Sequence, residues 1–178
     1  RRLDNGNFYV LSDIFGSGNT HVHLDYTVGN PTLAGGVTGL SIDLASASYN
    51  YDSTGSCAKH QVDLVYDNNA SSPLSLQMLG GTPLVSLHKL QAIDVKARET
   101  AAGSSQPCSG PMRSLRTYNL EYQNDVDTGQ FQLHRVTMIG QETKPERNLT
   151  LPVATYSYGE VTSASGALRP NPRMYAIP

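Results

Sequence analysis

The sequence predicts an all-β fold of antiparallel strands, because apolar and polar residues alternate in several short runs. Val22, Leu24 and Tyr26 form one such run, and the alternation places their side chains on one face of a strand. Glycine or proline interrupts the chain about every ten residues, and apolar residues at helical spacing are scarce. Short, half-buried strands between turns are typical of large β-hairpins in antiparallel, sandwich-like sheets.

Further strands are expected over 62–66 and 118–122, which show the same alternation. In the second of these, Tyr118, Leu120 and Tyr122 share one face and should point toward the core. The segment 87–97 leaves two interpretations open. Its apolar residues fit a helical stripe, and those near its end also fit a strand.

A hairpin is expected after residue 122, because the polar turn 124–129 leads into a second apolar run that starts at Phe131. The apolar positions of this run change phase between Leu133 and Val136. A two-residue period cannot change phase without an extra residue, so a β-bulge is expected near His134 and Arg135.

The composition indicates one folded domain, since a chain of 178 residues with 38% hydrophobic and 16% charged residues can bury a core. Residues 1–162 are expected to form a single all-β module, and residues 163–178 a proline-rich tail or linker toward a next module. The net charge of −2 provides no electrostatic reason to expect nucleic acid as a partner. No apolar run approaches the ~20 residues that span a bilayer. Without an initiator methionine or a signal pattern at its start, the chain is expected to be a piece of a longer polypeptide.

Cys57 and Cys108 are the only cysteines, and we expect them to form a disulfide bond. Both lie in turns rich in serine, glycine and proline, which are poor places for inert buried thiols. The bond would close a loop of about 50 residues and stabilise the fold by about 4 kcal/mol in the chain-entropy model. Two buried thiols in a reducing compartment are the alternative. The disulfide favours a secreted or cell-surface protein.

The residues that could bind a metal ion or catalyse a reaction have ordinary structural explanations. His21 and His23 share a strand face as two metal ligands could, but no third ligand follows at a telling spacing, so surface histidines are favoured. The acidic segment 125–129 lacks the spacing of a calcium loop and fits a polar turn. No nucleophile or phosphate-binding motif is found. We therefore expect no enzymatic activity, cofactor or metal.

The chain has ten tyrosines and no tryptophan. Exposed tyrosines can stack on sugar rings, and the best candidates for such a platform are Tyr49, Tyr51, Tyr156 and Tyr158. Packing in the core or across strands is the more ordinary role for any one of them.

Several motifs resemble the RHS/YD-repeat shell proteins, most closely their branch similar to the B subunits of Tc toxins. Asp13-Ile14 and Gly18-Asn19, between apolar runs at 8–11 and 22–26, look like the family's opening strand, D-x-x-G-N turn and returning strand. The other matching features are the Y-D-x-x-G of 51–55, a second YD pair at 66–67, the Y-x-L-x-Y of 118–122, the L-P pair at 151–152 and the Y-x-Y of 156–158. The resemblance covers roughly residues 8–159 and implies that 90–95 is a strand. The two YD pairs lie closer together than regular repeats, which favours an irregular module that flanks repeats.

In that family, β-hairpins wind into a hollow shell around a C-terminal segment. The resemblance therefore implies a non-enzymatic, toxin-associated structural module of a large secreted or surface protein, with neighbouring modules of the same polypeptide as partners. The alternative is a carbohydrate-binding β-sandwich of a surface or glycan-degrading protein, with a glycan as partner. A hydrolase without a recognisable motif is a weaker third hypothesis.

Overall fold

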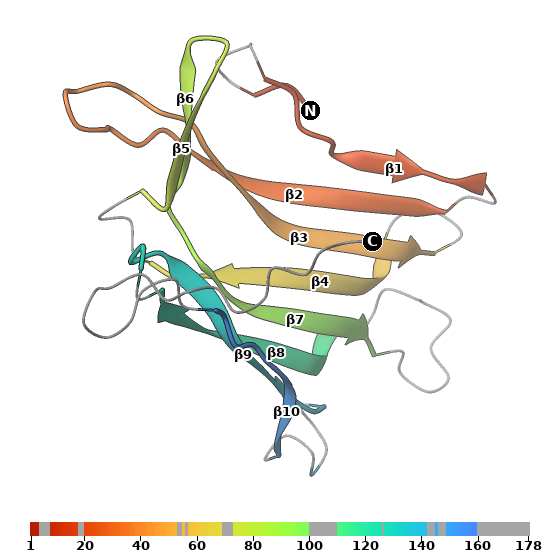
Figure 1. Cartoon of the computed structure of the whole chain (residues 1–178). Helices are drawn as coiled ribbons and strands as arrows, with labels where there is room; N and C mark the ends of the chain where they lie inside the picture. Colours follow the sequence, from red (N-terminus) through yellow and green to blue (C-terminus); the bar gives the residue numbers. More distant parts are fainter. Residues whose placement is uncertain are drawn as a thin grey trace, which may run out of the picture.

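The computed structural model describes residues 1–3, 8–17, 20–52, 55, 57–68, 73–99, 110–125, 127–141, 145 and 149–159. Within these residues the chain forms ten β-strands and no α-helix, and every strand pair is antiparallel (Figure 1). The predicted all-β, antiparallel fold is confirmed. The described residues include no helix with the length and hydrophobicity needed to cross a lipid bilayer.

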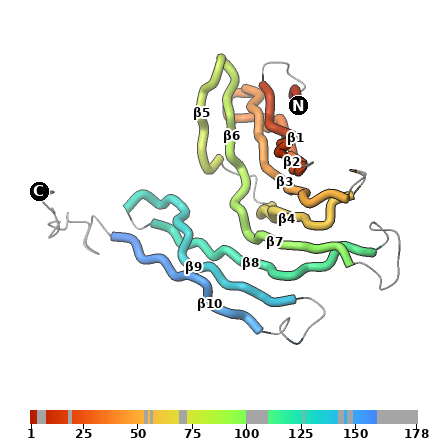
Figure 2. Tube along the Cα trace, turned by 90° about the vertical axis from the view of Figure 1, so that its right-hand side faces the viewer, coloured from red at the N-terminus to blue at the C-terminus, as the bar shows by residue number. Residues whose placement is uncertain are grey.

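Eight strands form one large sheet in the order β1-β2-β3-β4-β7-β8-β9-β10, and β5 pairs only with β6. The strands are β1 (Asp13–Phe15), β2 (His21–Gly29), β3 (Ser41–Tyr51), β4 (Ala58–Tyr66), β5 (Ser75–Leu79), β6 (Thr82–Ser86), β7 (Leu90–Arg98), β8 (Met112–Asn124), β9 (Phe131–Ile139) and β10 (Thr150–Thr155). β1 and β10 are the two edges and lie at opposite ends of a strongly twisted sheet, while the β5–β6 hairpin projects away from it (Figures 1 and 2).

The most deeply buried residues lie where this hairpin meets the start of β3. Leu40 and Leu84 form a parallel bridge, in which the Leu40 N–H donates to Pro83 O at 2.8 Å and the Val85 N–H donates to Leu40 O at 2.9 Å. Leu40, Val85 and Leu87 are all buried. The most buried side chains therefore join the hairpin to the sheet, and they do not form a core over a face of the sheet.

Strand register gathers apolar side chains on one side of the large sheet, which we call the apolar face. One row runs across five strands, because Leu64 pairs with Ile93, Ile93 with Tyr118, Tyr118 with Met138, and Met138 with Leu151. Side chains at paired positions point to the same face. The members of this row are half-buried or exposed, and none is buried. The sheet is thus a single layer over the described residues.

Three local predictions are confirmed. The strand that the resemblance implies over 90–95 lies within β7, which decides against a helix there. Glu121 pairs with Arg135 and Tyr122 with Leu133, so His134 is the extra residue of the predicted bulge. The turn before β9 is polar: Asp125 accepts hydrogen bonds from Thr128, and Gly129 has a positive φ of 69° that suits glycine.

Other predictions fall outside the described residues. Cys57 directly precedes β4, but Cys108 is not among them, so their bond stays a prediction. The proposed tail, 163–178, also lies outside, as does most of the loop between β7 and β8.

Candidate functional site

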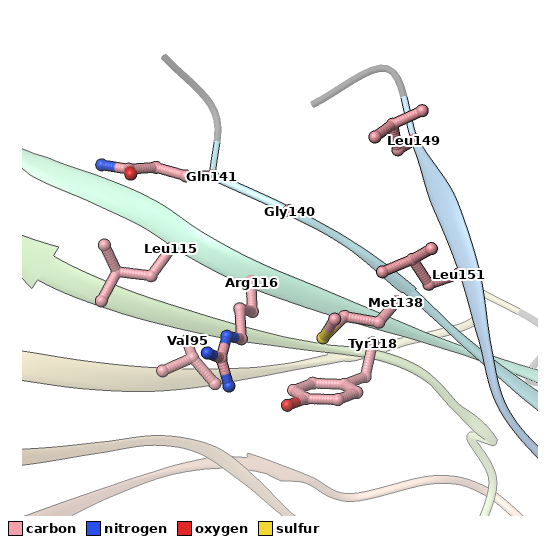
Figure 3. A pocket seen from close by; sticks show the side chains of 9 residues that line it. All are labelled: Val95, Leu115, Arg116, Tyr118, Met138, Gly140, Gln141, Leu149 and Leu151. Atoms are coloured by element: carbon pink, nitrogen blue, oxygen red, sulfur yellow. The ribbon is translucent and has the colours of Figure 1, made fainter. Parts of the chain in front are cut away.

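The apolar face contains a groove of about 570 Å³ over β7, β8, β9 and β10. Its floor is built by one residue from each strand: Val95, Tyr118, Met138 and Leu151 (Figure 3). Arg116 adds a positive charge at one side. An open, largely apolar groove that spans several strands is suited to another strand or hairpin rather than to a small polar molecule.

The opposite face carries polar residues from the same strands. Asp63 and Asp94 are directly opposite one another on β4 and β7, an arrangement in which like charges repel. Lys96 offsets this repulsion, because its Nζ lies 2.6 Å from Asp63 and 3.4 Å from Asp94. The hydrogen bond to Asp63 raises the pKa of Lys96. Thr117 of β8 also donates to Asp94, so this row has a structural explanation.

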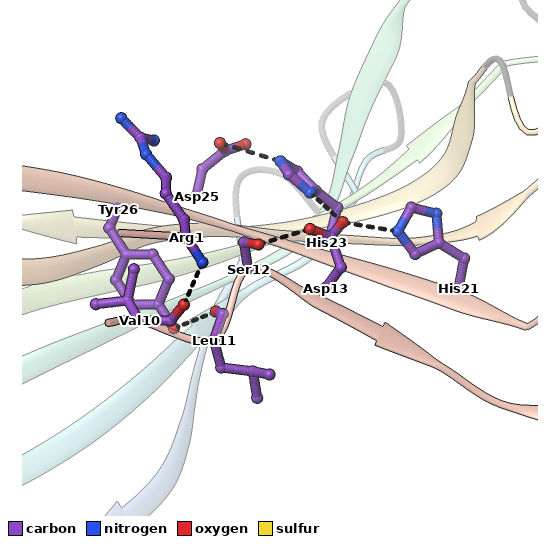
Figure 4. Close-up of polar contacts among 9 residues, drawn as sticks. All are labelled: Arg1, Val10, Leu11, Ser12, Asp13, His21, His23, Asp25 and Tyr26. Carbon is purple, nitrogen blue, oxygen red and sulfur yellow. Dashed lines mark hydrogen bonds and ion pairs between the residues drawn. The ribbon is translucent and has the colours of Figure 1, made fainter. Parts of the chain in front are cut away.

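At the β1 edge of this polar face, Asp13, His21 and His23 form what we call the His–Asp cluster (Figure 4). Asp13 Oδ1 lies 2.9 Å from His21 Nε2 and 2.8 Å from His23 Nδ1. The register explains this convergence, since Asp13 pairs with His23 across β1 and β2, and His21 is two residues away on the same face.

Neighbouring side chains hold each member of the cluster. The Ser12 hydroxyl donates to Asp13 Oδ2 at 2.6 Å, and His23 Nε2 lies 3.3 Å from Asp25 Oδ1 (Figure 4). The His21 ring stacks between two aromatic rings, those of Phe15 and Tyr51, with centroid distances of 4.6 Å on both sides. The rings and the carboxylate are therefore oriented before anything binds.

The electrostatics of the cluster favour a carboxylate that stays charged. The hydrogen bond from Ser12, followed by those from His23 and His21, holds the pKa of Asp13 well below its usual range. The bond to Asp13 raises the pKa of His23. Burial, together with the charges of Asp13 and Asp25, raises the pKa of Tyr51. The cluster is thus an anionic centre flanked by two imidazoles.

The structure does not bring the four candidate tyrosines together. Tyr49 stacks on His60 on the apolar face, whereas Tyr51 stacks on His21 on the polar face. Asn50 between them has a positive φ of 56°, which breaks the alternation and separates the two rings.

The other two tyrosines lie beside β9, which β4, β7 and β8 separate from β3. The Tyr156 N–H donates to His134 O at 2.8 Å, and the Tyr158 hydroxyl donates to Leu133 O at 2.7 Å. A sugar platform made of all four tyrosines is not formed in this arrangement, and smaller sugar sites at either location stay a prediction.

Comparison of the sequence with models of protein families finds no match, and no curated protein is significantly similar. Sequence reasoning missed Asp13 as the third member of the cluster. The available signal was the expected hairpin of the two strands, since pairing Phe15 with His21 places Asp13 opposite His23.

Proposed function

We propose that the chain is a non-enzymatic wall module of a larger secreted or surface protein of the RHS/YD-repeat, toxin-associated kind, and that its β-hairpins stack with neighbouring modules of the same polypeptide. The observation that carries this proposal is the single-layer sheet, whose apolar face no other described residues cover. Soluble single domains normally bury such a face under a second layer of structure. Among the described residues, the second sheet consists of the β5–β6 hairpin alone, which contacts the start of β3.

The edges of the sheet support the same function. Leu151 and Val153 of β10 are 49% and 51% exposed, so the edge strand presents apolar side chains as well as unpaired backbone groups. Pro152 cannot donate a backbone hydrogen bond, which limits pairing at its own position. A neighbouring module would cover both the edge and the adjacent groove.

The carbohydrate-binding alternative has less support, because the four tyrosines lie at separate places on two faces. The resemblance to shell proteins and the uncovered face instead favour a module whose stability depends on neighbours. A continuous apolar surface of this kind is a site of association in proteins generally.

The test is self-association of the isolated chain. Without its neighbours, the apolar face should pair with a second copy, and a hydrophobic dye should bind the groove. Met138→Lys places a charge on the apolar face. Thr137→Lys is the matched control, because Thr137 is adjacent in β9 and points to the polar face.

Light scattering and dye fluorescence across a concentration series should show association and dye binding for the parent chain and for Thr137→Lys. Both signals should fall for Met138→Lys, with circular dichroism confirming that the variant is folded. A strictly monomeric parent chain that binds no dye would overturn the wall function. Saturable binding on a glycan array that a tyrosine variant abolishes would favour the alternative instead.

A further inference from the structure

We propose that the His–Asp cluster is a binding site for a divalent transition-metal ion such as Zn²⁺. One potential ligand atom from each of Asp13, His21 and His23 lies within 4.8 Å of the other two. Around a tetrahedral zinc ion, ligand atoms stand roughly 3.3 Å apart. The oxygen–nitrogen distances of 2.8 and 2.9 Å are close to that spacing, so small outward shifts of the side chains admit the ion.

The types of ligand atom in the cluster determine which metal ions it should bind best. Two imidazole nitrogens and one carboxylate oxygen suit zinc and its first-row neighbours, whereas calcium and magnesium prefer sites made of oxygen. The side chains of His21, His23 and Asp13 are 24%, 36% and 33% exposed, which leaves the ion open to solvent on one side. Water, or a side chain of a neighbouring module, completes the coordination.

Contacts around the cluster are those that metal-binding histidines generally have. His23 directs Nδ1 at Asp13, and its other nitrogen, Nε2, faces the Asp25 carboxylate. A carboxylate on the second nitrogen fixes the tautomer of a ligating histidine and strengthens its binding. Ser12 fixes Asp13 in the same way, through the carboxylate oxygen that does not face the histidines.

The place of the cluster in the fold indicates a structural role for the ion. Asp13 belongs to β1, which has only three residues, and both histidines belong to β2. A bound ion would cross-link this short edge strand to the sheet. The Phe15 ring of β1 also stacks on His21, and the Tyr26 hydroxyl donates to Leu11 O just before β1, so the ion would add to these contacts.

Titration with Co²⁺ tests the site, because Co²⁺ substitutes for Zn²⁺ and its visible absorption reports the coordinating atoms. The untagged full chain should bind one Co²⁺, Zn²⁺ should displace it, and Zn²⁺ should raise the melting temperature. His23→Ala should abolish the absorption. Asp25→Asn should keep the site but weaken binding roughly 10-fold, because it removes an orienting partner and no ligand.

His60→Ala is the matched control, since His60 lies on the apolar face and stacks on Tyr49. This variant should bind Co²⁺ like the parent chain. The proposal is overturned if the parent chain shows no saturable Co²⁺ spectrum at millimolar metal. It is equally overturned if a folded His23→Ala variant keeps the parent spectrum. Neither result depends on self-association, so the wall function and the metal site are tested separately.

Discussion

Gly39 makes the closest approach in the seam between the β5–β6 hairpin and the sheet, so Gly39→Ala is a sharp test of that packing. A Cβ atom on residue 39 would stand 2.7 Å from Val85 Cγ2 and 3.4 Å from Pro83 O. Carbon atoms in unstrained contact stay about 3.5–4.0 Å apart. Val85 is only 5% exposed, so its side chain cannot swing away freely.

The expected cost of Gly39→Ala is about 1–3 kcal/mol of unfolding free energy, the range for overpacking a filled site. Val85→Ala should cost about 2 kcal/mol, from two buried carbons at about 0.8 kcal/mol each plus a small cavity. The double variant lacks the methyl group that the new Cβ would strike. Its cost should therefore fall below the sum of the single costs by about 1 kcal/mol.

Urea unfolding followed by circular dichroism measures the four free energies of this cycle. Gly159→Ala is the control, because nothing lies within 4 Å of its Cβ position and its stability should not change. Costs that add within about 0.5 kcal/mol would mean that residues 39 and 85 do not touch. The hairpin would then not be held against β3 as described.

Three further predictions concern ionisation, the cysteines and the apolar face. Burial, then the charge of Asp43, raises the pKa of Tyr66, so the folded chain retains the phenol proton at a pH where the unfolded chain loses it. The contribution of protonated Tyr66 to the unfolding free energy should be fully present below about pH 10, and it should be lost as the pH rises through the pKa of folded Tyr66. In urea unfolding at alkaline pH, the Tyr66→Phe variant should therefore lose less unfolding free energy than the parent chain. Reduction of Cys57 and Cys108 should lower the melting temperature, and two free thiols by mass spectrometry in protein from an oxidising compartment would contradict the bond. Leu120→Ala should cost about 1–2 kcal/mol, less than a fully buried leucine, while Glu121→Ala should stay within about 0.5 kcal/mol; a cost above about 3 kcal/mol for Leu120→Ala would mean that the apolar face is covered.

Alternation in the sequence predicted which side of each strand is apolar, but it could not show whether that side is covered. Tyr118, Leu120 and Tyr122 do share a face, as predicted, yet all three are only half-buried. The two-residue alternation of a strand shows which side chains share a face, but it contains no information on whether another layer of structure packs against that face. From the sequence, these side chains were expected to point into a core, because the apolar face of a sheet is usually buried against a second layer.

The His–Asp cluster was only partly predictable for a related reason. The pattern placed His21 and His23 on one face, but the third member depends on how the chain turns between Phe15 and His21. The separation of Tyr49 from Tyr51 depends on the left-handed backbone of Asn50, which a two-residue period does not anticipate.

The bulges explain how one apolar face persists although the apolar phase of the sequence changes. Five of the seven pairings in the large sheet, within the described residues, contain a register shift. Between β8 and β9 the extra residue is His134, and in a regular register without the bulge Tyr122 would pair with His134 and not with Leu133. Between β2 and β3 the extra residue is Ala45, and in a regular register without the bulge Tyr26 would pair with Ala45 and Leu44 with Thr27.

These two bulges keep apolar side chains on the same side of the sheet, and each bulge also bends its strand and increases the local twist. The same extra residues that keep the apolar face continuous thus contribute to the strong twist of the sheet (Figure 2). A twisted sheet with one apolar face cannot cover that face by folding flat on itself. A surface of matching curvature would lower its free energy, and under the proposed wall function a neighbouring hairpin with the same pattern of bulges would provide one.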